Sequence, residues 1–112
     1  MRNLFLGDLD SYKYNEVVDK ISHDFQVEKS ELDKMEFLIA YIEEANWEGT
    51  AYCLVRDRET GSLYEIHGGH CSCNGFEEQW IPQIISKEYL LSKPSPYRDD
   101  QEMQQFAVEL FT

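Results

Sequence analysis

The sequence predicts a single α+β domain over residues 1–112, in which a small antiparallel sheet, with the hairpin 50–67 at its centre, is packed by about three helices. Three observations predict this fold class. Apolar residues recur at helical spacing before residue 50, the period becomes that of strands in residues 50–67, and a helical pattern returns near the C-terminal end. The length of 112 residues suits one domain with one core.

Two helices are predicted in the N-terminal half. Asn15 is a suitable N-cap for the first helix, whose apolar residues follow a helical spacing: Val17, Val18, Ile21 and Phe25. The second helix, over residues 30–46, has the clearest pattern of the chain. Ser30 and Asp33 form a capping box at its start, apolar residues recur along one face, and Gly49 is well placed to end it.

The next segment changes to the pattern of a β-hairpin. Residues 50–56 and 62–67 are rich in Tyr, Val, Ile and Leu, and the connection "DRETG" suits a turn closed by a glycine in the left-handed region. Tyr52 and Leu54 point to one face of this hairpin and Cys53 to the other, where we expect a buried thiol. Apolar residues on both faces predict a hairpin that helices cover on each side.

Shorter elements follow the hairpin. Residues 80–85 form an extended segment, and a short helical turn runs from Ser86 to about Leu91. A C-terminal helix then packs onto the body of the domain through an apolar stripe: Met103, Phe106, Ala107 and Leu110.

The charge of the chain restricts its partners. There are 22 acidic and 10 basic residues, and the formal net charge is −12. Phosphates repel such a domain, so we expect no direct binding to nucleic acid or to an anionic membrane, and attraction to basic surfaces. No apolar run has the length of a membrane span, and the first residues lack an export signal, so we expect a cytoplasmic protein. Three cysteines, an odd number, argue against a closed disulfide framework.

The stretch "IHGGHCSCNGFEEQW", residues 66–80, concentrates the residues that carry chemistry. The interpretation with the fewest assumptions is a structural turn, in which Gly68 and Gly69 reverse the chain and Phe76 and Trp80 return it to the core. A second interpretation is a zinc site with these candidate ligands: His67, His70, Cys71 and Cys73. Its weakness is that all of the ligands lie in one segment. A third is a catalytic thiolate at one of the two cysteines beside one of the two histidines, although the excess of acids would raise the pKa of a thiol.

The motif "HCSC-x-G-x-E-x-x-W", from His70 to Trp80, resembles a pattern in small uncharacterised proteins of bacteriophages, prophages and some bacteria. The wider resemblance runs from Tyr52 to Pro82, about a quarter of the chain. That group of proteins has no settled activity, so the resemblance implies a context and no mechanism. It implies a protein encoded by a phage that acts in the cytoplasm of the host bacterium.

Charge and context together predict a non-catalytic acidic interaction protein. We expect it to bind a basic host protein that handles nucleic acid, and to inhibit or modulate that protein as a nucleic-acid mimic does. The predicted partner-binding residues lie on and next to the expected helix 30–46: Glu31, Glu36, Glu43, Glu44 and Glu48. The alternative function is a small zinc-binding module that uses the "HGGHCSC" segment; otherwise we expect no cofactor.

Overall fold

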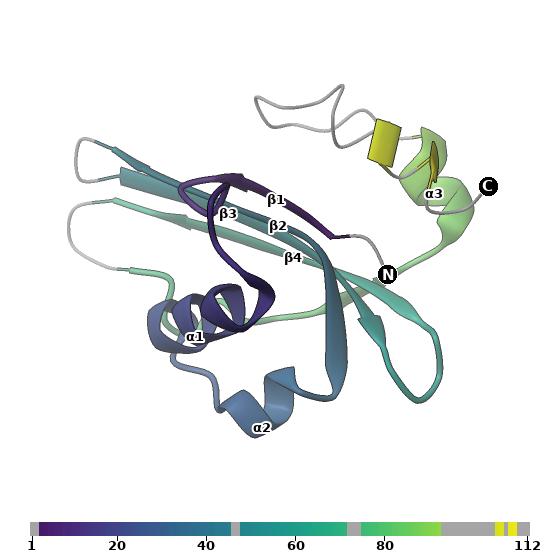
Figure 1. The fold of residues 1–112 in the computed structure, drawn as a ribbon, viewed down its shortest axis with the longest axis horizontal. Coiled ribbons are helices and arrows are strands. Elements are labelled where there is room, and N and C mark those ends of the chain that lie inside the picture. Colours follow the sequence, from purple (N-terminus) through teal and green to yellow (C-terminus); the bar gives the residue numbers. More distant parts are fainter. Residues whose placement is uncertain (1–2, 46–47, 72–74, 93–104, 107, 110–112) are drawn as a thin grey trace.

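The computed structural model describes residues 3–45, 48–71, 75–92, 105–106 and 108–109. Its elements in chain order are β1 (Leu4–Gly7), α1 (Tyr14–Phe25), α2 (Lys29–Leu32), β2 (Met35–Ala45), β3 (Glu48–Asp57), β4 (Leu63–His70), β5 (Gln83–Ile85) and α3 (Lys87–Ser92). The strands form one five-stranded sheet in the order β1-β2-β3-β4-β5 (Figure 1). β1 pairs with β2 in parallel, and every other neighbouring pair is antiparallel.

The predicted fold class is therefore wrong. A small antiparallel sheet packed by about three helices was expected, whereas the sheet is mixed, has five strands and dominates the fold, and the helices are short. The parallel partner β1 is only four residues long, and it pairs with residues 39–42, far along the chain. A parallel pair needs a long crossover connection, which α1 and α2 supply here.

The largest correction concerns residues 30–46. In place of one long helix, α2 ends at Leu32 and the strand β2 begins at Met35. Residues 37–42 are all buried, because β2 lies between β1 and β3 and both of its faces are covered. A strand buried on both faces has a continuous apolar run, which cannot be distinguished by periodicity from a segment of a buried helix. Gly49, expected to end a helix, lies in β3.

The hairpin prediction is confirmed. β3 and β4 pair along the sequence from Gly49 opposite His70 to Arg56 opposite Leu63, and they are the third and fourth strands of the sheet. Gly61 closes the connection with a φ of 80°, in the left-handed region that glycine adopts without strain. Cys53 is fully buried, as expected.

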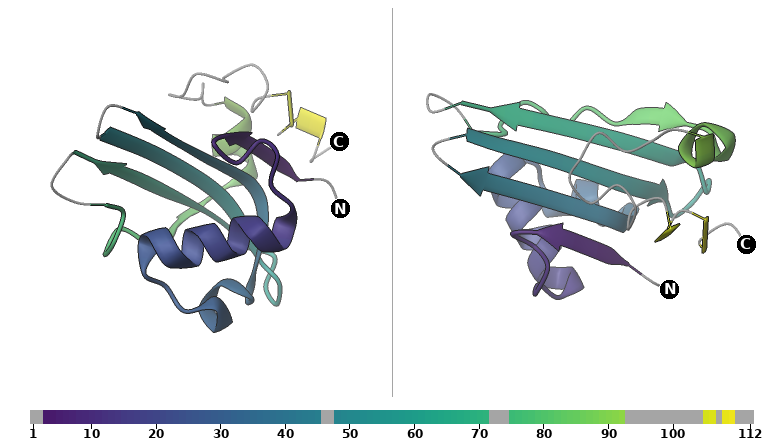
Figure 2. Two further views of the ribbon diagram at one scale, coloured as in Figure 1. Left: turned by 60° about the vertical axis from the view of Figure 1, so that its left-hand side comes forward. Right: turned by 90° about the horizontal axis from the view of Figure 1, so that it is seen from above.

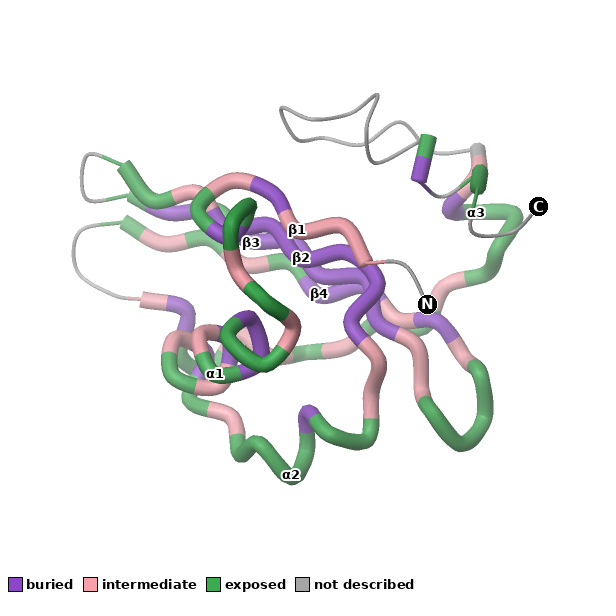
Figure 3. Tube along the Cα trace, viewed as in Figure 1, coloured by how far each residue is buried: buried purple, intermediate pink, exposed green. Residues whose placement is uncertain are grey.

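Two apolar clusters cover the two faces of the sheet. On one face, α1 and α2 cover a cluster that includes Ala51, Cys53 and Val55; Figure 2 shows α1 alongside that face. On the other face, Tyr52 and Leu54 belong to a second cluster, which Leu90 of α3 and Phe106 complete. Figure 3 shows that the buried positions concentrate in the central strands. The alternation along β3 thus agrees with the predicted opposite orientation of Tyr52 and Cys53.

The flanking elements agree in part with the sequence. The helix α1 buries the predicted stripe of Val17, Val18, Ile21 and Phe25, although its N-cap is Lys13 instead of Asn15. The predicted turn near residue 86 is α3, and Phe106 is buried as expected. Met103, Ala107 and Leu110 lie outside the described residues. No helix in the described parts of the chain is long and apolar enough to cross a membrane.

Candidate functional site

The sequence suggested that the glycines of the "HGGH" segment reverse the chain, but they do not. They lie inside β4, which continues to His70. Gly68 is needed for packing. A Cβ atom at this position would lie 2.9 Å from Cδ1 of Phe76 and 3.2 Å from Cζ of Phe25. The rings of Phe25 and Phe76 are stacked, with centroids 5.1 Å apart. The missing side chain therefore makes room for an aromatic pair that ties the loop to α1.

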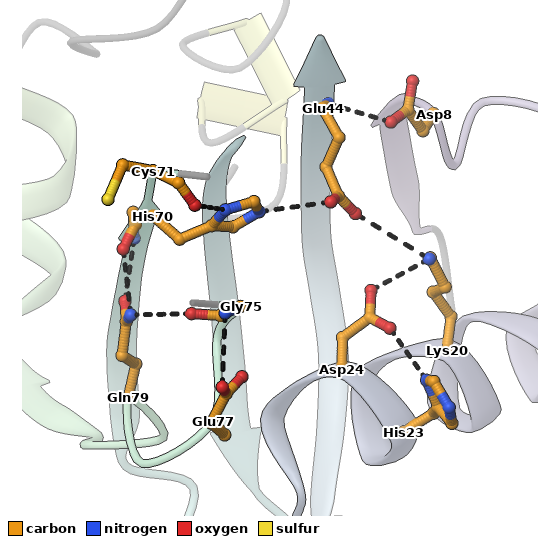
Figure 4. A network of polar contacts seen from close by, with 11 residues as sticks. Asp8, Lys20, His23, Asp24, Glu44, His70, Cys71, Gly75, Glu77 and Gln79 are labelled. Atoms are coloured by element: carbon orange, nitrogen blue, oxygen red, sulfur yellow. Dashed lines mark hydrogen bonds and ion pairs between the residues drawn. The ribbon is translucent and has the colours of Figure 1, made fainter. Parts of the chain in front are cut away.

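The chain that follows β4 is held by the side chain of Gln79 (Figure 4). Oε1 of Gln79 accepts a hydrogen bond from the Gly69 amide at 2.8 Å, and Nε2 donates to the Gly69 carbonyl at 2.9 Å and to the Gly75 carbonyl at 3.2 Å. Phe76 is buried and Trp80 is partly buried against the core, which confirms that both residues anchor the segment. These contacts support a structural role for much of the stretch.

The described part of the structure does not bring the candidate zinc ligands together. His67 and His70 are three positions apart in one strand, so their side chains lie on opposite faces of the sheet. His67 contacts Tyr52 of the second cluster, and His70 contacts Phe76 of the first. Cys71 is exposed, and Cys73 lies outside the described residues. No group of three or more potential ligands occurs among the described residues, so the zinc site stays a prediction.

His70 instead forms a bridge across three strands. In the register, Gly49 of β3 stands opposite Glu44 of β2 on one side and opposite His70 of β4 on the other. A Cβ atom on Gly49 would lie within 3.0 Å of several ring atoms of His70. Because Gly49 has no side chain, the imidazole crosses over it, and Nε2 lies 3.1 Å from Oε2 of Glu44.

The protonation state of His70 follows from its two partners. Nδ1 lies 3.0 Å from the Cys71 carbonyl oxygen and Nε2 faces the Glu44 carboxylate, and both of these oxygens are acceptors. Only the doubly protonated imidazolium donates to both. The Cys71 carbonyl raises the pKa of His70, burial opposes this effect, and Glu44 adds to the rise. The side chain is 9% exposed, while the residue as a whole is half-buried, and its contacts favour the protonated ring.

A network of charges continues from this bridge to α1 (Figure 4). Oε1 of Glu44 lies 3.9 Å from the Lys20 ammonium, which is 2.9 Å from Asp24. The Asp8 carboxylate accepts a hydrogen bond from the Glu44 amide at 3.0 Å. Each carboxylate in this network already has a partner, so the network stabilises the end of the sheet and offers little free charge to another molecule.

The thiols show different environments. Burial raises the pKa of the Cys53 thiol to about 12, which keeps it protonated and unreactive in the folded protein. Cys71 is exposed, but the imidazole of His70 contacts its carbonyl oxygen. The hypothesis of a catalytic thiolate has no further support from these contacts, and it stays untested.

The five predicted partner-binding glutamates do not form one surface. Glu36 pairs with Arg56 across β2 and β3 at 2.9 Å, and Glu44 is engaged by His70 and Lys20. Glu43 neighbours Glu44 in β2 and therefore points to the opposite face. Glu31 and Glu48 are exposed on separate elements. The long helix that was expected, together with its neighbours, to present these residues does not form, because Met35–Ala45 is the strand β2.

The acidic residues of the described chain divide into two classes. One class has hydrogen bonds or ion pairs, as in the network above. The other class, here called the unengaged acids, is exposed and has no side-chain hydrogen bond or ion pair in the described structure: Asp10, Glu28, Glu31, Asp33, Glu48, Glu59, Glu78 and Glu88. Free acidic charge is therefore left at several places on the surface.

One groove gathers three of the unengaged acids around an aromatic residue. This Trp80 groove has a volume of about 530 Å³ and is lined by Phe25, Gln26, Val27, Glu28, Glu31, Met35, Glu78, Trp80 and Pro82. Of these, the sequence pointed only to Glu31 as a partner-binding residue. Glu78 and Trp80 lie in the same motif as His70, but nothing in the sequence showed that they meet the α1–α2 connection.

The chain was compared with protein-family models, with curated proteins and with solved structures, and no match was found in any of the three.

Proposed function

We propose that the protein is a non-catalytic acidic interaction protein that binds a basic partner and inhibits or modulates it. Within this proposal it is encoded by a phage and acts in the bacterial cytoplasm on a host protein that handles nucleic acid. The observation that carries the proposal is the set of unengaged acids, which are exposed and not neutralised by the described residues around them.

The physical basis is electrostatic. The chain carries a formal net charge of −12, and its free carboxylates are distributed over loops, helices and strand ends. Such a surface attracts a basic protein from a distance and speeds the encounter, while it repels nucleic acid. A partner whose basic surface normally contacts phosphates would therefore be occupied in competition with its own nucleic acid.

The test begins with capture of partners from bacterial lysate on the immobilised protein at low salt, followed by identification of what salt elutes. The affinity of the purified partner is then measured by calorimetry at increasing salt, with duplex DNA as a competitor. We expect a basic partner, an affinity that falls steeply with salt, and displacement by DNA. Binding that is indifferent to salt would refute the proposal.

The alternative function, a zinc-binding module, is tested by native mass spectrometry of protein purified without chelator or added metal. One zinc ion per chain that is lost when Cys71 and Cys73 are replaced by Ser would support it. A metal-free mass would refute the zinc-binding module and leave the stretch as a structural turn.

A further inference from the structure

We propose that the Trp80 groove binds an arginine side chain of the basic partner. This inference rests on the proposed function and adds to it the place where the partner is held and the chemical group that is recognised. It combines three features of the groove: a fixed aromatic wall, three carboxylates that have no partner in the described structure, and the absence of a competing cation among its lining residues.

The aromatic wall is held in place by the core behind it. The indole of Trp80 meets the ring of Phe25 edge to face, with centroids 5.5 Å apart and an angle of 78° between the planes. It also contacts Phe37, with centroids 6.0 Å apart. Phe25 and Phe37 are both buried. Trp80 therefore has little freedom to rotate, and it offers a prepared surface on which a cation can stack.

The carboxylates lie around this wall and are free to bind. Glu28 and Glu31 come from the start of α2, and Glu78 comes from the segment before Trp80. None of the three has a side-chain hydrogen bond or ion pair within the described chain. The nearby Lys29 does not neutralise them, because its ammonium pairs with Asp19 of α1. Three unpaired negative charges beside one groove attract a cation and exclude an anion.

A helix end and a turn set the backbone at the groove. Among the described residues, Gln26 and Glu78 are the non-glycine residues with positive φ, at 57° and 67°, and both line the groove. Gln26 has an ordinary explanation, since it ends α1 in the left-handed conformation. Glu78 has one too, since it is the third residue of a turn that the Gln79 amide closes by donating to the Phe76 carbonyl at 3.1 Å. This turn places Glu78 on the groove.

Arginine fits this combination better than lysine does. A guanidinium is planar, so it can stack on an indole and at the same time donate several hydrogen bonds to carboxylates in its plane. An ammonium is a compact and strongly hydrated point charge, so it gives up more hydration when it stacks, and it lacks the planar fork that pairs with a carboxylate. The aliphatic part of the arginine side chain would lie against Met35 and Pro82, which also line the groove.

The experiment compares three peptides that are identical except at one repeated position, which is arginine, lysine or citrulline. The protein carries Trp47→Phe, which leaves Trp80 as its one tryptophan, because the chain contains two. Binding is followed by the fluorescence of Trp80 and by its indole N–H signal in NMR spectra at low salt. We expect the arginine peptide to bind most tightly and to shift the indole signal, and the citrulline peptide, which has no charge, not to bind.

Two triple variants provide the matched comparison. One removes the groove charges with Glu28→Gln, Glu31→Gln and Glu78→Gln; the other removes three unengaged acids elsewhere with Asp10→Asn, Glu59→Gln and Glu88→Gln. Both change the net charge equally, and all of the replaced residues are exposed, so both variants should fold, which circular dichroism checks. We expect the groove variant to bind the arginine peptide about tenfold more weakly than the wild-type groove does, and the control variant to lose much less affinity.

Each other outcome overturns a defined part of the reasoning. Equal weakening by the two variants would mean that charge alone binds the peptide; it would refute the groove and leave the proposed function intact. Equal affinity for arginine and lysine would refute the recognition of the guanidinium. An arginine peptide that does not bind the wild-type groove would refute the inference, and the salt dependence of the captured partner would then decide the proposed function separately.

Discussion

The two adjacent glycines of β4 allow a sharp test of why the "HGGH" segment has its sequence. Gly68 faces the stacked rings of Phe25 and Phe76, whereas a Cβ atom on Gly69 would meet nothing closer than the Gly49 carbonyl oxygen at 3.9 Å. Neither glycine has a positive φ, so backbone strain does not separate the two positions. The substitutions Gly68→Ala and Gly69→Ala therefore differ mainly in packing.

The expected magnitude follows from the distances. A methyl group at Gly68 would stand 2.9 Å from one ring atom and 3.2 Å from another, but carbon atoms pack best at about 3.5–4.0 Å. The aromatic pair must move, and overpacking of this kind costs about 1–3 kcal/mol. Replacing glycine by alanine in a strand returns about 0.5–1 kcal/mol. We expect Gly68→Ala to lower the free energy of unfolding by about 1–2 kcal/mol, and Gly69→Ala to leave it unchanged or raise it slightly.

Urea unfolding followed by tryptophan fluorescence measures both variants against the wild-type protein. The urea concentration at the midpoint of unfolding should fall for Gly68→Ala. The slope of the unfolding free energy against urea concentration should not change, because the surface exposed on unfolding stays the same. Equal stability of the two variants would refute the packing argument. A large loss of stability in Gly69→Ala would show that the fold requires the second glycine for a reason other than the packing around its Cβ position.

Three further predictions concern buried or charged groups. Because its contacts raise the pKa of His70 in the folded protein, the protonated ring stabilises the fold below the unfolded value of about 6.5, and this stabilisation is lost as pH rises through the raised pKa. Urea unfolding should therefore show that His70→Gln is most destabilising at mildly acidic pH. Tyr52→Phe removes the hydroxyl that donates to Glu65 at 2.6 Å; since Glu65 is 3% exposed, urea unfolding should show a loss of about 1–3 kcal/mol. Alkylation of the native protein should modify Cys71 and spare Cys53, as peptide mass spectrometry would show.

The contradicting results differ for each of these predictions. A destabilisation by His70→Gln that grows with pH would mean that the neutral imidazole is the stabilising form. An unchanged midpoint in Tyr52→Phe would mean that the buried carboxylate does not depend on this hydroxyl. Labelling of Cys53 without unfolding would mean that the centre of the sheet opens in the native protein.

Local patterns were sufficient for part of this fold. The hairpin of β3 and β4 was predictable because its turn and its two strands are adjacent in the sequence, and because alternate residues of a strand face opposite sides. The helix α1 was predictable from its amphipathic stripe. In both elements the signal and the structure span the same few residues.

The positions of the site residues depend on contacts between segments that are far apart in the sequence. The sequence gathered His67 and His70 into one candidate site because they are close in the chain, but a strand separates neighbouring side chains onto different faces. It also grouped five glutamates on and next to an expected helix, most of which is the strand β2. No local signal showed that Glu28 and Glu31 lie beside Trp80, since these residues are about fifty positions apart in the chain.

Composition and short periodic patterns were enough to predict the acidic chain, the hairpin, the first helix and the residues that anchor the loop after β4. That residues 35–45 form a strand depends on the sheet around them, since an apolar run suits either conformation until its neighbours are known. The bridge between His70 and Glu44 likewise depends on the sheet, because that contact exists only when the register places Gly49 between them. Pairing between distant segments depends on the whole sheet, and no local stretch of the chain contains that information.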